Sequence, residues 1–315
     1  MRRSDERGIA LLLTLLVLTF MVALILEFDA EARREYRDAA AFRDNFKATV
    51  LARAAVQAAR GVLQQDFLKD KQAGLSFDAP TDLWALPIRD YPIGDGLLTA
   101  QIEDERSKLN LNDLANAANA NDKKDKIGRF KRLFELAQIN PDLVDAIVDW
   151  VDKDDQPEPS GAESLYYQSL RPSYQAANTQ LQTFLELRLI KGMTPEILGK
   201  LSKLVTVYES AGDSMVNINT ADPLVIQALK PEITQGIAAD IVQARPFKNN
   251  KVDDLDRVSS FLNIGNQIRH LYDIKSDLFL ARMTVRVNEM TRNATVILRR
   301  DPSTGTSTVQ YYRVL

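Results

Sequence analysis

The sequence that decides the fold is IALLLTLLVLTFMVALIL, residues 9–26, which runs for eighteen positions without a charged side chain. As an α-helix with a rise of about 1.5 Å per residue it is about 27 Å long, which nearly spans the hydrocarbon core of a bilayer. The preceding eight residues, MRRSDERG, hold three arginines and two acids. This net positive flank is expected to stay in the cytoplasm, so the rest of the chain is expected on the other side of the membrane.

Three interpretations of the apolar segment compete: a membrane anchor, a cleaved secretory signal and a buried core helix. The triplet Ala30-Glu31-Ala32 has the small-residue pattern of a signal cleavage site. However, the apolar run exceeds the roughly 7 to 15 residues of a signal core, and acidic residues crowd the triplet. A helix that is apolar on every face needs a far larger protein around it to be buried. The membrane anchor is therefore favoured.

The helical pattern continues beyond the apolar segment. From Glu27 to Leu68 there is no proline and only one glycine, Gly61, and apolar residues recur at three-, four- or seven-residue steps among charged ones. The pattern predicts one long helix over residues 9–68, about 90 Å long if unbroken. Such a rod fits either the axis of a helical filament or a membrane anchor followed by a stalk, and periodicity alone does not separate the two.

Strand-like sequence lies near both ends of the part that follows. Residues 97–111 show short alternating runs, and residues 281–289, 294–299 and 308–315 alternate apolar and polar side chains. About 160 residues of helix-like sequence separate the two regions. If the early strand pairs with the late ones, the helical block is an insertion. The predicted class is α+β: a long N-terminal transmembrane helix and a small α/β core with antiparallel strands, split by a large all-α inserted domain.

Three helix starts in this block are marked by a capping side chain directly before a proline. They are Asn140-Pro141, Thr194-Pro195 and Asp222-Pro223. On the helix that is predicted to begin at Pro141, the apolar side chains form one face. Asp149 and Asp152 are therefore expected to point toward solvent near the end of that helix.

An acidic loop follows. Residues 149–163, DWVDKDDQPEPSGAE, hold six carboxylates and one lysine. Such a set repels itself unless it is solvated or gathered around a cation, and its hard oxygen ligands suit Ca2+. Asp152, Asp154 and Glu163 fall at positions 1, 3 and 12 of an EF-hand-like register, but Pro157 replaces the glycine required at position 6. The pattern predicts an oxygen-ligand loop that is not an EF-hand, with a simply solvated loop as the alternative.

A further signal stands at the start of the apolar segment. A charged leader, then Gly8, then an apolar helix beginning at Ile9 resemble the type IV prepilin and pseudopilin signal, in which a membrane peptidase cuts after the glycine and the apolar helix is kept. Four more motifs carry a wider resemblance. They are SKLNLNDL (107–114), AIVDWVDKDDQPEPSGAESLYY (146–167), VNINTADPLVIQAL (216–229) and YDIKSDLFLARM (272–283). With them, the chain resembles the minor pseudopilin K family of the type II secretion system.

The resemblance implies cleavage between Gly8 and Ile9, with Ile9 as a methylated N-terminus. It also assigns a role to Leu13, the fifth residue counted from Ile9. Other pseudopilins carry a glutamate there, which pairs with a neighbour's N-terminal amine, and the K family lacks it because no later subunit is added above a tip subunit. Two departures are Ile9 where pilins often have phenylalanine, and the lack of the cysteine pair that some relatives carry. Neither alters the predicted topology.

Domain order, cofactor and partners follow from the same resemblance. The expected parts are a leader (1–8), the transmembrane and assembly helix (9–68), the first part of a pseudopilin α/β core (69–112), an inserted α-domain (113–275) and the C-terminal strands of the core (276–315). Calcium is expected, with Asp152, Asp154, Asp155 and Glu163 as ligands. The expected partners are minor pseudopilins I and J in a tip complex, the major pseudopilin and the prepilin peptidase. The chain is expected to cross the inner membrane once, with its bulk in the periplasm, and to initiate or cap the pseudopilus that exports folded proteins across the outer membrane.

Composition excludes several functions. The chain has no cysteine and one histidine, His270, which excludes disulfides, thiolate metal sites and a cysteine nucleophile. Acid pairs such as Asp104 with Glu105, or Asp149 with Asp152, have no nucleophile, phosphate loop or general-base histidine beside them in the sequence. The sequence therefore predicts a protein that is not an enzyme.

The alternative function is a membrane-tethered nucleic-acid binder or another component of a type IV pilus-like system. Residues 216–245 have the rhythm of a helix-hairpin-helix module, in which the backbone of a glycine hairpin contacts phosphates. Here the hairpin, 230–236, lacks closely spaced glycines and contains Glu232, and residues 217–257 hold six acids against five bases. The net charge of the whole chain is -3. Two packed scaffold helices are therefore favoured, and no nucleic acid is expected.

Overall fold

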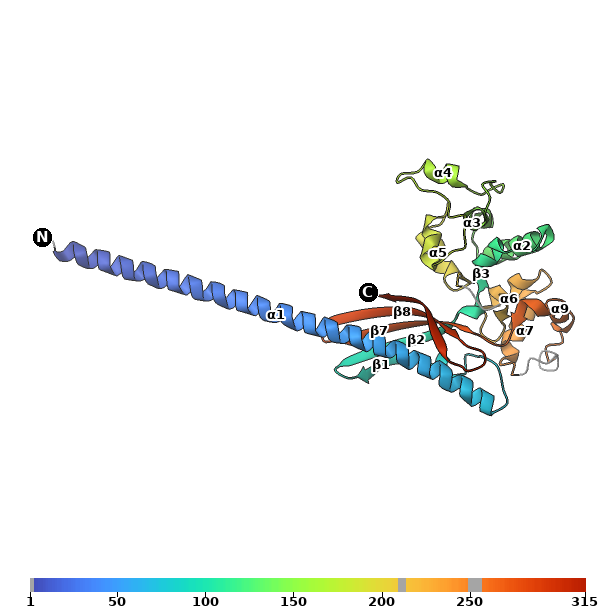
Figure 1. Ribbon diagram of the computed structural model, residues 1–315, viewed down its shortest axis with the longest axis horizontal. Coiled ribbons are helices and arrows are strands. Elements are labelled where there is room, and N and C mark those ends of the chain that lie inside the picture. The colour runs from blue at the N-terminus through green and yellow to red at the C-terminus, as the bar shows by residue number, and fades with distance from the viewer. Residues whose placement is uncertain (1–2, 209–213, 249–256) are drawn as a thin grey trace.

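One α-helix, α1 (Arg3–Gln72), forms the axis of the molecule in this computed structural model, which describes residues 3–208, 214–248 and 257–315 (Figure 1). Its 70 residues make a rod of about 105 Å. The rod is unbroken because no proline interrupts it. It ends where Gly74 takes a left-handed φ of 69° and the N–H of Leu75 donates to the carbonyl of Asp70. The predicted N-terminal helix is confirmed, and it extends beyond 9–68 at both ends.

The apolar N-terminal part of α1 contacts no other element of the described chain. Residues 9–26 are all exposed, and the helix is long and apolar enough to cross a membrane. In Figure 1 this part projects away from the rest of the molecule, and the largest group of helices lies toward the opposite end of the rod.

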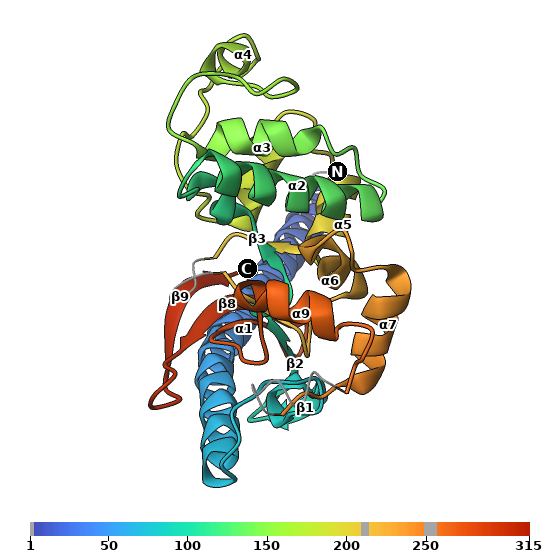
Figure 2. The same ribbon diagram turned by 90° about the vertical axis from the view of Figure 1, so that its right-hand side faces the viewer.

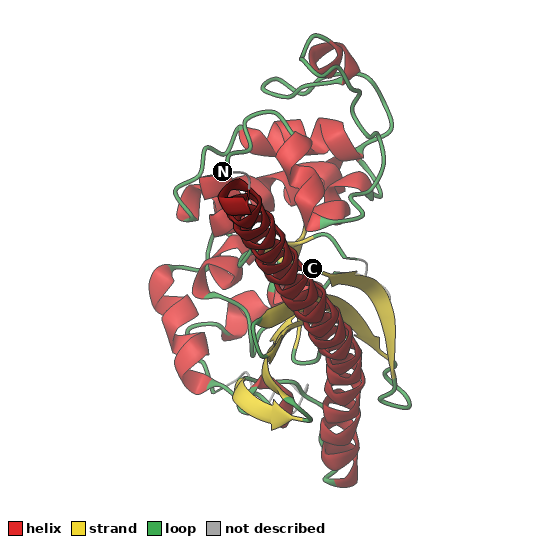
Figure 3. Ribbon diagram, turned by 90° about the vertical axis from the view of Figure 1, so that its left-hand side faces the viewer, coloured by secondary structure: helices red, strands yellow, loops and turns green. Residues whose placement is uncertain are grey.

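Beside the second half of α1 lies a five-stranded antiparallel sheet of order β1-β2-β7-β8-β9 (Figure 3). Its strands are β1 (Ile88–Ile93), β2 (Gly96–Asp104), β7 (Leu278–Val287), β8 (Met290–Arg300) and β9 (Ser307–Val314). β2 pairs with β7 from Leu97 opposite Arg286 to Asp104 opposite Phe279. Strands from before and after the helical block therefore form one sheet, as the α+β prediction required.

The contact between α1 and the sheet is made by small side chains on the helix. Ala48, Ala52, Ala55 and Ala59 recur at three- or four-residue steps and are at most 8% exposed. Alternate residues of the sheet face them, and β7 contributes Phe279, Ala281, Met283, Val285 and Val287. Alanine lets the helix axis approach the sheet closely, so this layer is tightly packed.

The chain between β2 and β7 folds into a helical region with its own core. Its α-helices are α2 (Ala120–Leu136), α3 (Leu143–Val151), α4 (Ser164–Gln168), α5 (Pro195–Leu201), α6 (Pro223–Leu229), α7 (Gln235–Ala244) and α9 (Leu262–Gln267). Short 3-10 helices are η2 (Glu105–Ser107), η3 (Leu111–Ala115), η4 (Phe184–Leu189) and η5 (Arg269–Leu271), and η1 (Leu83–Ala85) precedes the sheet. Two small parallel sheets pair β3 (Leu109–Asn110) with β4 (Val205–Thr206) and β5 (Val216–Asn217) with β6 (Tyr272–Asp273). Figure 2 shows α2, α3 and α4 in one group and α6, α7 and α9 in another.

The limits of this insertion differ from the sequence estimate of 113–275. The chain leaves the sheet at Asp104 and returns to it at Leu278. Leu109 and Leu111, which the sequence division assigned to the first part of the core, are at most 2% exposed in the core of the insertion. The reason is that residues just after β2 turn away from the sheet and pair with β4 instead of continuing along β7.

Helices α5 and α6 begin at the predicted prolines. The side chain of Thr194 accepts from the N–H of Ile197, and that of Asp222 accepts from the N–H of Leu224. The prediction for Pro141 is wrong by two residues, since α3 begins at Leu143. The amide oxygen of Asn140 accepts from the N–H of Asp142 and holds a turn there before the helix starts.

Buried polar groups join the insertion to the sheet. The carboxylate of Asp104, at the end of β2, accepts hydrogen bonds from Ser276 Oγ at 2.5 Å, Thr220 Oγ1 at 2.5 Å and Asn217 Nδ2 at 2.9 Å. Nearby, the guanidinium of Arg300 donates to both oxygens of Asp78 at 2.6 Å. Because these groups are buried and hydrogen-bonded to one another, they fix the two regions in one relative position.

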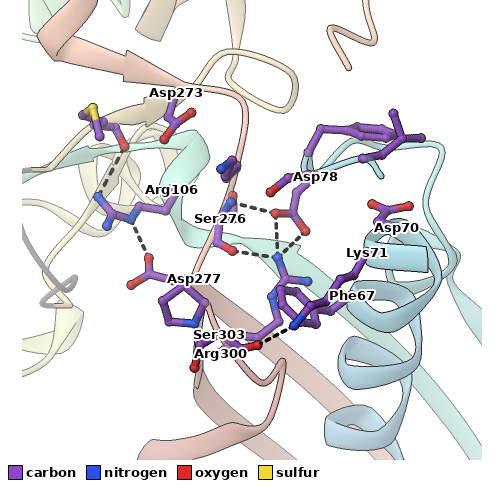
Figure 4. Close-up of a pocket in the computed structure, with 16 residues that line it drawn as sticks. Phe67, Asp70, Lys71, Asp78, Arg106, Asp273, Ser276, Asp277, Arg300 and Ser303 are labelled. Atoms are coloured by element: carbon purple, nitrogen blue, oxygen red, sulfur yellow. Dashed lines mark hydrogen bonds and ion pairs between the residues drawn. The ribbon is translucent and has the colours of Figure 1, made fainter. Parts of the chain in front are cut away.

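A pocket of about 520 Å³ opens at this junction (Figure 4). Figure 4 shows Asp78, Ser276 and Arg300 bonded together on one side and Arg106 paired with Asp277 on the other. In each pair the guanidinium group is hydrogen-bonded to the carboxylate. No histidine lines this pocket among the described residues.

Candidate metal centre

Three of the four predicted metal ligands come together at the end of α3. Asp152 follows the last turn of α3, Asp154 lies in the loop, and Glu163 immediately precedes α4. Each offers a carboxylate oxygen, and these oxygens lie within 4.8 Å of one another. The fourth residue, Asp155, lies outside this group, since its carboxylate accepts from Asn178 Nδ2 at 3.2 Å. The structure therefore brings together Asp152, Asp154 and Glu163.

Asp149 lies under this loop. The expectation that it points to solvent is wrong: its side chain is 0% exposed. The loop folds back over α3, and the N–H of Glu158 donates to Asp149 Oδ1 at 3.0 Å. Gly161 lies so close that a Cβ there would sit 1.9 Å from Asp149 Oδ2. Glycine at position 161 is therefore required for the loop to close.

Several oxygens around the cluster lack hydrogen-bond partners. Among the described residues these include Asp152 Oδ1, both carboxylate oxygens of Glu163 and the amide oxygen of Asn178, all shielded from solvent. A buried carboxylate without a partner is costly, and such groups in native proteins mark an ion, a water or a functional role. Carboxylate and amide oxygens are the ligands that Ca2+ takes in proteins. The donor set thus fits a hard divalent cation.

The raised pKa values of the carboxyl groups in the cluster also favour a bound cation. Burial, followed by the charges of Asp149 and Asp152, raises the pKa of Glu163 to about 7. Burial also raises the pKa of Asp149 to about 6. One lysine of α2, Lys123, lies 3.3 Å from Asp152 and 2.9 Å from Glu158. A divalent cation would favour the ionised form of every carboxylate around it and so reverse these upward shifts.

Sequence reasoning missed one residue of this centre. Asn178 lies fifteen positions after Glu163, and its backbone takes a positive φ of 44° that turns the side chain onto the loop. Its amide donates to the carbonyl of Asp154 at 3.2 Å. A single asparagine in a long loop carries no spacing signal, so only the fold reveals its position.

The residues of the leader and assembly predictions lie in α1. Gly8, Ile9 and Leu13 are all exposed on the continuous helix, and nothing lies within 4 Å of the position that a Cβ would take at Gly8. Leu13 is 57% exposed, so its side chain is free to meet lipid or another helix. Of the predicted leader, Met1 and Arg2 lie outside the described residues.

The helix-hairpin-helix segment is packed as scaffold. Helices α6 and α7 bury Val225, Ile226 and Ile241 in the core of the insertion. Arg132 of α2 contacts the hairpin between them and donates a hydrogen bond to the carbonyl of Pro231 at 2.9 Å. This arrangement agrees with the prediction of two packed scaffold helices.

Comparison with known proteins gives the family. The models of two domains described as type II secretion system (T2SS), protein K match residues 107–210 and 216–274. A type II secretion system protein K of Klebsiella pneumoniae is 34% identical over 254 residues, which cover 76% of this chain and 75% of that protein. The chain belongs to the type II secretion system protein K family. The predicted family is thereby confirmed.

Other members of the protein K family match along most of the chain. The protein K of Aeromonas hydrophila is 28% identical and is matched over 90% of both chains. A solved structure, the GspK-GspI-GspJ complex from enterotoxigenic Escherichia coli, shares the fold with a TM-score of 0.70 at 20% identity, covering 87% of this chain and 97% of that chain. As a member of the protein K family, the chain is a minor pseudopilin and a structural component of the secretion system, and the nucleic-acid alternative is not favoured.

Proposed function

We propose that this minor pseudopilin stands at the tip of the pseudopilus, in a complex with minor pseudopilins I and J, and initiates or caps the fibre. The observation that carries the proposal is the position of the insertion, which lies toward the end of α1 opposite its apolar segment. A bulky helical region in that place would block the stacking of another subunit above it. The solved relative assembles with GspI and GspJ, which supports the same partners here.

In this proposal helix α1 contacts lipid before assembly and other subunits after it. Before assembly its apolar segment lies in the inner membrane, with the bulk of the chain in the periplasm. After assembly the same side chains pack against helices of neighbouring subunits, the major pseudopilin included. Beyond the membrane segment, Phe28, Tyr36 and Phe42 continue the exposed apolar surface, each at least 74% exposed. Leu13 offers no carboxylate to the N-terminal amine of a later subunit, which suits a subunit above which none is added.

Calcium completes the acidic loop. Asp152, Asp154 and Glu163 would hold the ion, and the amide oxygen of Asn178 lies beside the same loop with no other partner among the described residues. When bound, the ion supplies positive charge that holds the loop between α3 and α4 closed. The ion has a structural role, and the chain performs no enzymatic reaction.

The N-terminus of the natural protein tests the maturation step. We expect mass spectrometry of the protein purified from membranes to show a methylated Ile9. Replacing Gly8 by leucine should leave the eight-residue leader in place, whereas Gly61→Leu, at an exposed glycine of the same helix, should be processed normally. A mature chain that starts near Arg33, after the Ala30-Glu31-Ala32 triplet, would contradict both the cleavage site and the retained helix.

The position in the fibre needs a second measurement. Labelling an engineered surface cysteine in the insertion with gold should mark one end of each isolated pseudopilus. We expect the label to require subunits I and J. Labels spaced along the length of the fibre would refute the tip position even if Ile9 is methylated.

A further inference from the structure

Helix α2 has a positive net charge, whereas the net charge of the whole chain is negative. Its seventeen residues, Ala120–Leu136, include six lysines and arginines against three acids. Part of this charge is used inside the fold. Lys123 pairs with the acidic loop, Lys126 pairs with Asp122 at 2.8 Å, and Lys131 pairs with Asp145 at 2.7 Å. Among the described residues, no carboxylate lies at contact distance from the other three cations of α2.

These remaining cations line a groove of about 580 Å³. The groove lies between α2 and two later segments, the start of the α6–α7 hairpin and the end of α9 with η5. Four of its basic residues, Lys124, Arg129, Arg132 and Lys230, have no carboxylate in contact within the described chain, and its acids are Asp125 and Glu135. Leu229, Ile268 and Leu271 also line the groove; the first two are at most 5% exposed, and Leu271 is the half-buried apolar side chain among them.

The contacts that these cations do make leave their charge unbalanced. Arg132 donates to the backbone carbonyls of Gln227 and Pro231, at 2.8 and 2.9 Å. Lys230 donates to the amide oxygen of Gln267 at 2.5 Å. Arg129 forms no hydrogen bond and no ion pair with any described residue; burial lowers its pKa, and this effect exceeds the opposing attraction of the carboxylates of Asp113, Asp122 and Asp125, none of which contacts it. A half-buried guanidinium without a partner is a group that gains from binding an anion.

A glycine in the middle of α2 adds an independent observation. Gly128 lies in the helix interior, where glycine is less favourable than any other residue except proline. Packing does not require it, because a Cβ there would have nothing within 4 Å. Lys124 and Arg132 lie four residues before and after it, on the same face of the helix. The missing side chain leaves backbone exposed between the cations, which allows the backbone of a ligand to approach closely.

We propose that this groove binds an acidic segment of a partner protein. The segment lies across Gly128, its carboxylates pair with Arg129, Arg132 and Lys124, and an apolar side chain packs on the half-buried Leu271. Guanidinium groups bind carboxylates in a planar, two-bond geometry, and the apolar surface of Leu271 in the same groove suits a peptide that carries both acidic and apolar side chains.

A nucleic acid fits the groove less well. Asp125 and Glu135 line it on α2, and residues 217–257, which supply its other wall in part, carry a net charge of -1 from five bases and six acids. A continuous phosphate backbone would meet Asp125 and Glu135. The proposal is separate from the calcium loop and from the position in the fibre, since it uses neither.

The test measures binding of a defined probe to the full-length protein in detergent micelles. The probe is a fluorescein-labelled peptide of alternating glutamate and leucine, and the reference is the matching peptide of lysine and leucine. We expect fluorescence anisotropy to show binding of the glutamate peptide alone, weakening as salt rises from about 0.05 to 0.5 M. Arg129→Gln and Lys124→Gln should each weaken binding about five- to tenfold. The matched control is Lys203→Gln, an exposed lysine outside the groove, which should leave binding unchanged.

Gly128→Leu separates binding from stability. Leucine favours the helix, so the melting temperature should stay the same or rise, while the filled groove should bind the peptide at least tenfold more weakly. Equal affinity of the parent for both peptides, or unchanged affinity in the three groove variants, would overturn the proposal. Tighter binding of a DNA duplex than of the glutamate peptide would overturn it in favour of a nucleic acid.

Discussion

Replacing Glu163 by glutamine should have opposite effects with and without calcium. Glu163 is 6% exposed and faces the carboxylates of Asp149, Asp152, Asp154 and Asp155. Without a cation, ionised Glu163 is repelled by these neighbours and has lost its hydration. Glutamine keeps the size of the side chain and removes the charge, so it relieves this repulsion and also removes a metal ligand.

The magnitude follows from the pKa. Glu163 has a pKa of about 7 in the fold against 4.5 for the ordinary group. The folded state therefore binds the proton more tightly, and the stability that this binding contributes is lost as pH rises from about 4.5 to 7. At about 1.4 kcal/mol per pKa unit the loss is about 3.5 kcal/mol, which corresponds to about 5 °C in melting temperature for 315 residues with an unfolding entropy of about 2.1 cal/mol/K each. Asp149, with a pKa of about 6 against 3.8, adds a loss of the same sign at lower pH.

The assay is thermal unfolding of the full chain in detergent between about pH 5 and pH 8, with excess chelator or with saturating calcium. In chelator the melting temperature of the parent should fall as pH rises from about 5 to about 8, and that of Glu163→Gln should fall much less. In calcium the parent should have the higher melting temperature of the two, because only the parent keeps the full ligand set. Glu196→Gln, at an exposed glutamate of α5, is the matched control and should follow the parent throughout.

Two results would refute this reasoning. If the parent in chelator melts at the same temperature across the pH range, the carboxylates of the loop are not held together as described. If calcium raises the melting temperature of parent and Glu163→Gln equally, the ion is bound elsewhere.

Three further predictions concern single positions. Leu13→Glu should leave folding intact but change incorporation or secretion, and unchanged pseudopilus assembly and export of secreted protein would count against the role of Leu13. In Gly161→Ala the new Cβ would meet Asp149 Oδ2 at 1.9 Å, so the free energy of unfolding should fall by about 1–3 kcal/mol and calcium should raise the melting temperature less than in the parent. In the control Gly199→Ala the new Cβ has nothing within 4 Å, so the free energy of unfolding should rise by about 0.5–1 kcal/mol. Asp104→Leu removes an acceptor shared by Ser276, Thr220 and Asn217. Because Thr220 is only partly buried and Asn217 also donates to the carbonyl of Asp78, the expected cost in urea unfolding is about 2–3 kcal/mol; a loss below about 1 kcal/mol would show that the junction does not depend on this carboxylate.

Local patterns were sufficient for the elements with strong periodicity. The apolar run and the absence of proline predict α1, and alternation of apolar and polar side chains predicts β7 and β8, which are buried on one face by the helix. β1 (Ile88–Ile93) was missed, because it is an edge strand that is largely exposed, contains Pro92 and has no alternation to reveal it. An exposed edge imposes no pattern on its side chains.

The sequence predicted only part of the candidate metal site, and the reason differs from the one for β1. Asp152, Asp154 and Glu163 lie close in sequence, so spacing was enough to group them. The burial of Asp149 depends on the loop folding back across α3, and the position of Asn178 depends on a left-handed backbone in a later loop. Such contacts arise from tertiary folding, and neither helical periodicity nor residue spacing encodes them.

The unbroken course of α1 has a mechanical consequence. The portion that is apolar enough to cross a membrane and the portion that packs on the sheet belong to the same 70-residue helix, without a proline kink or a loop between them. A displacement of the inner end of the helix along its axis would therefore reach the alanine layer without a flexible joint in between, and the buried network around Asp104 would carry it into the helical insertion. Any advance of the base of such a subunit would be matched by an equal advance of the insertion.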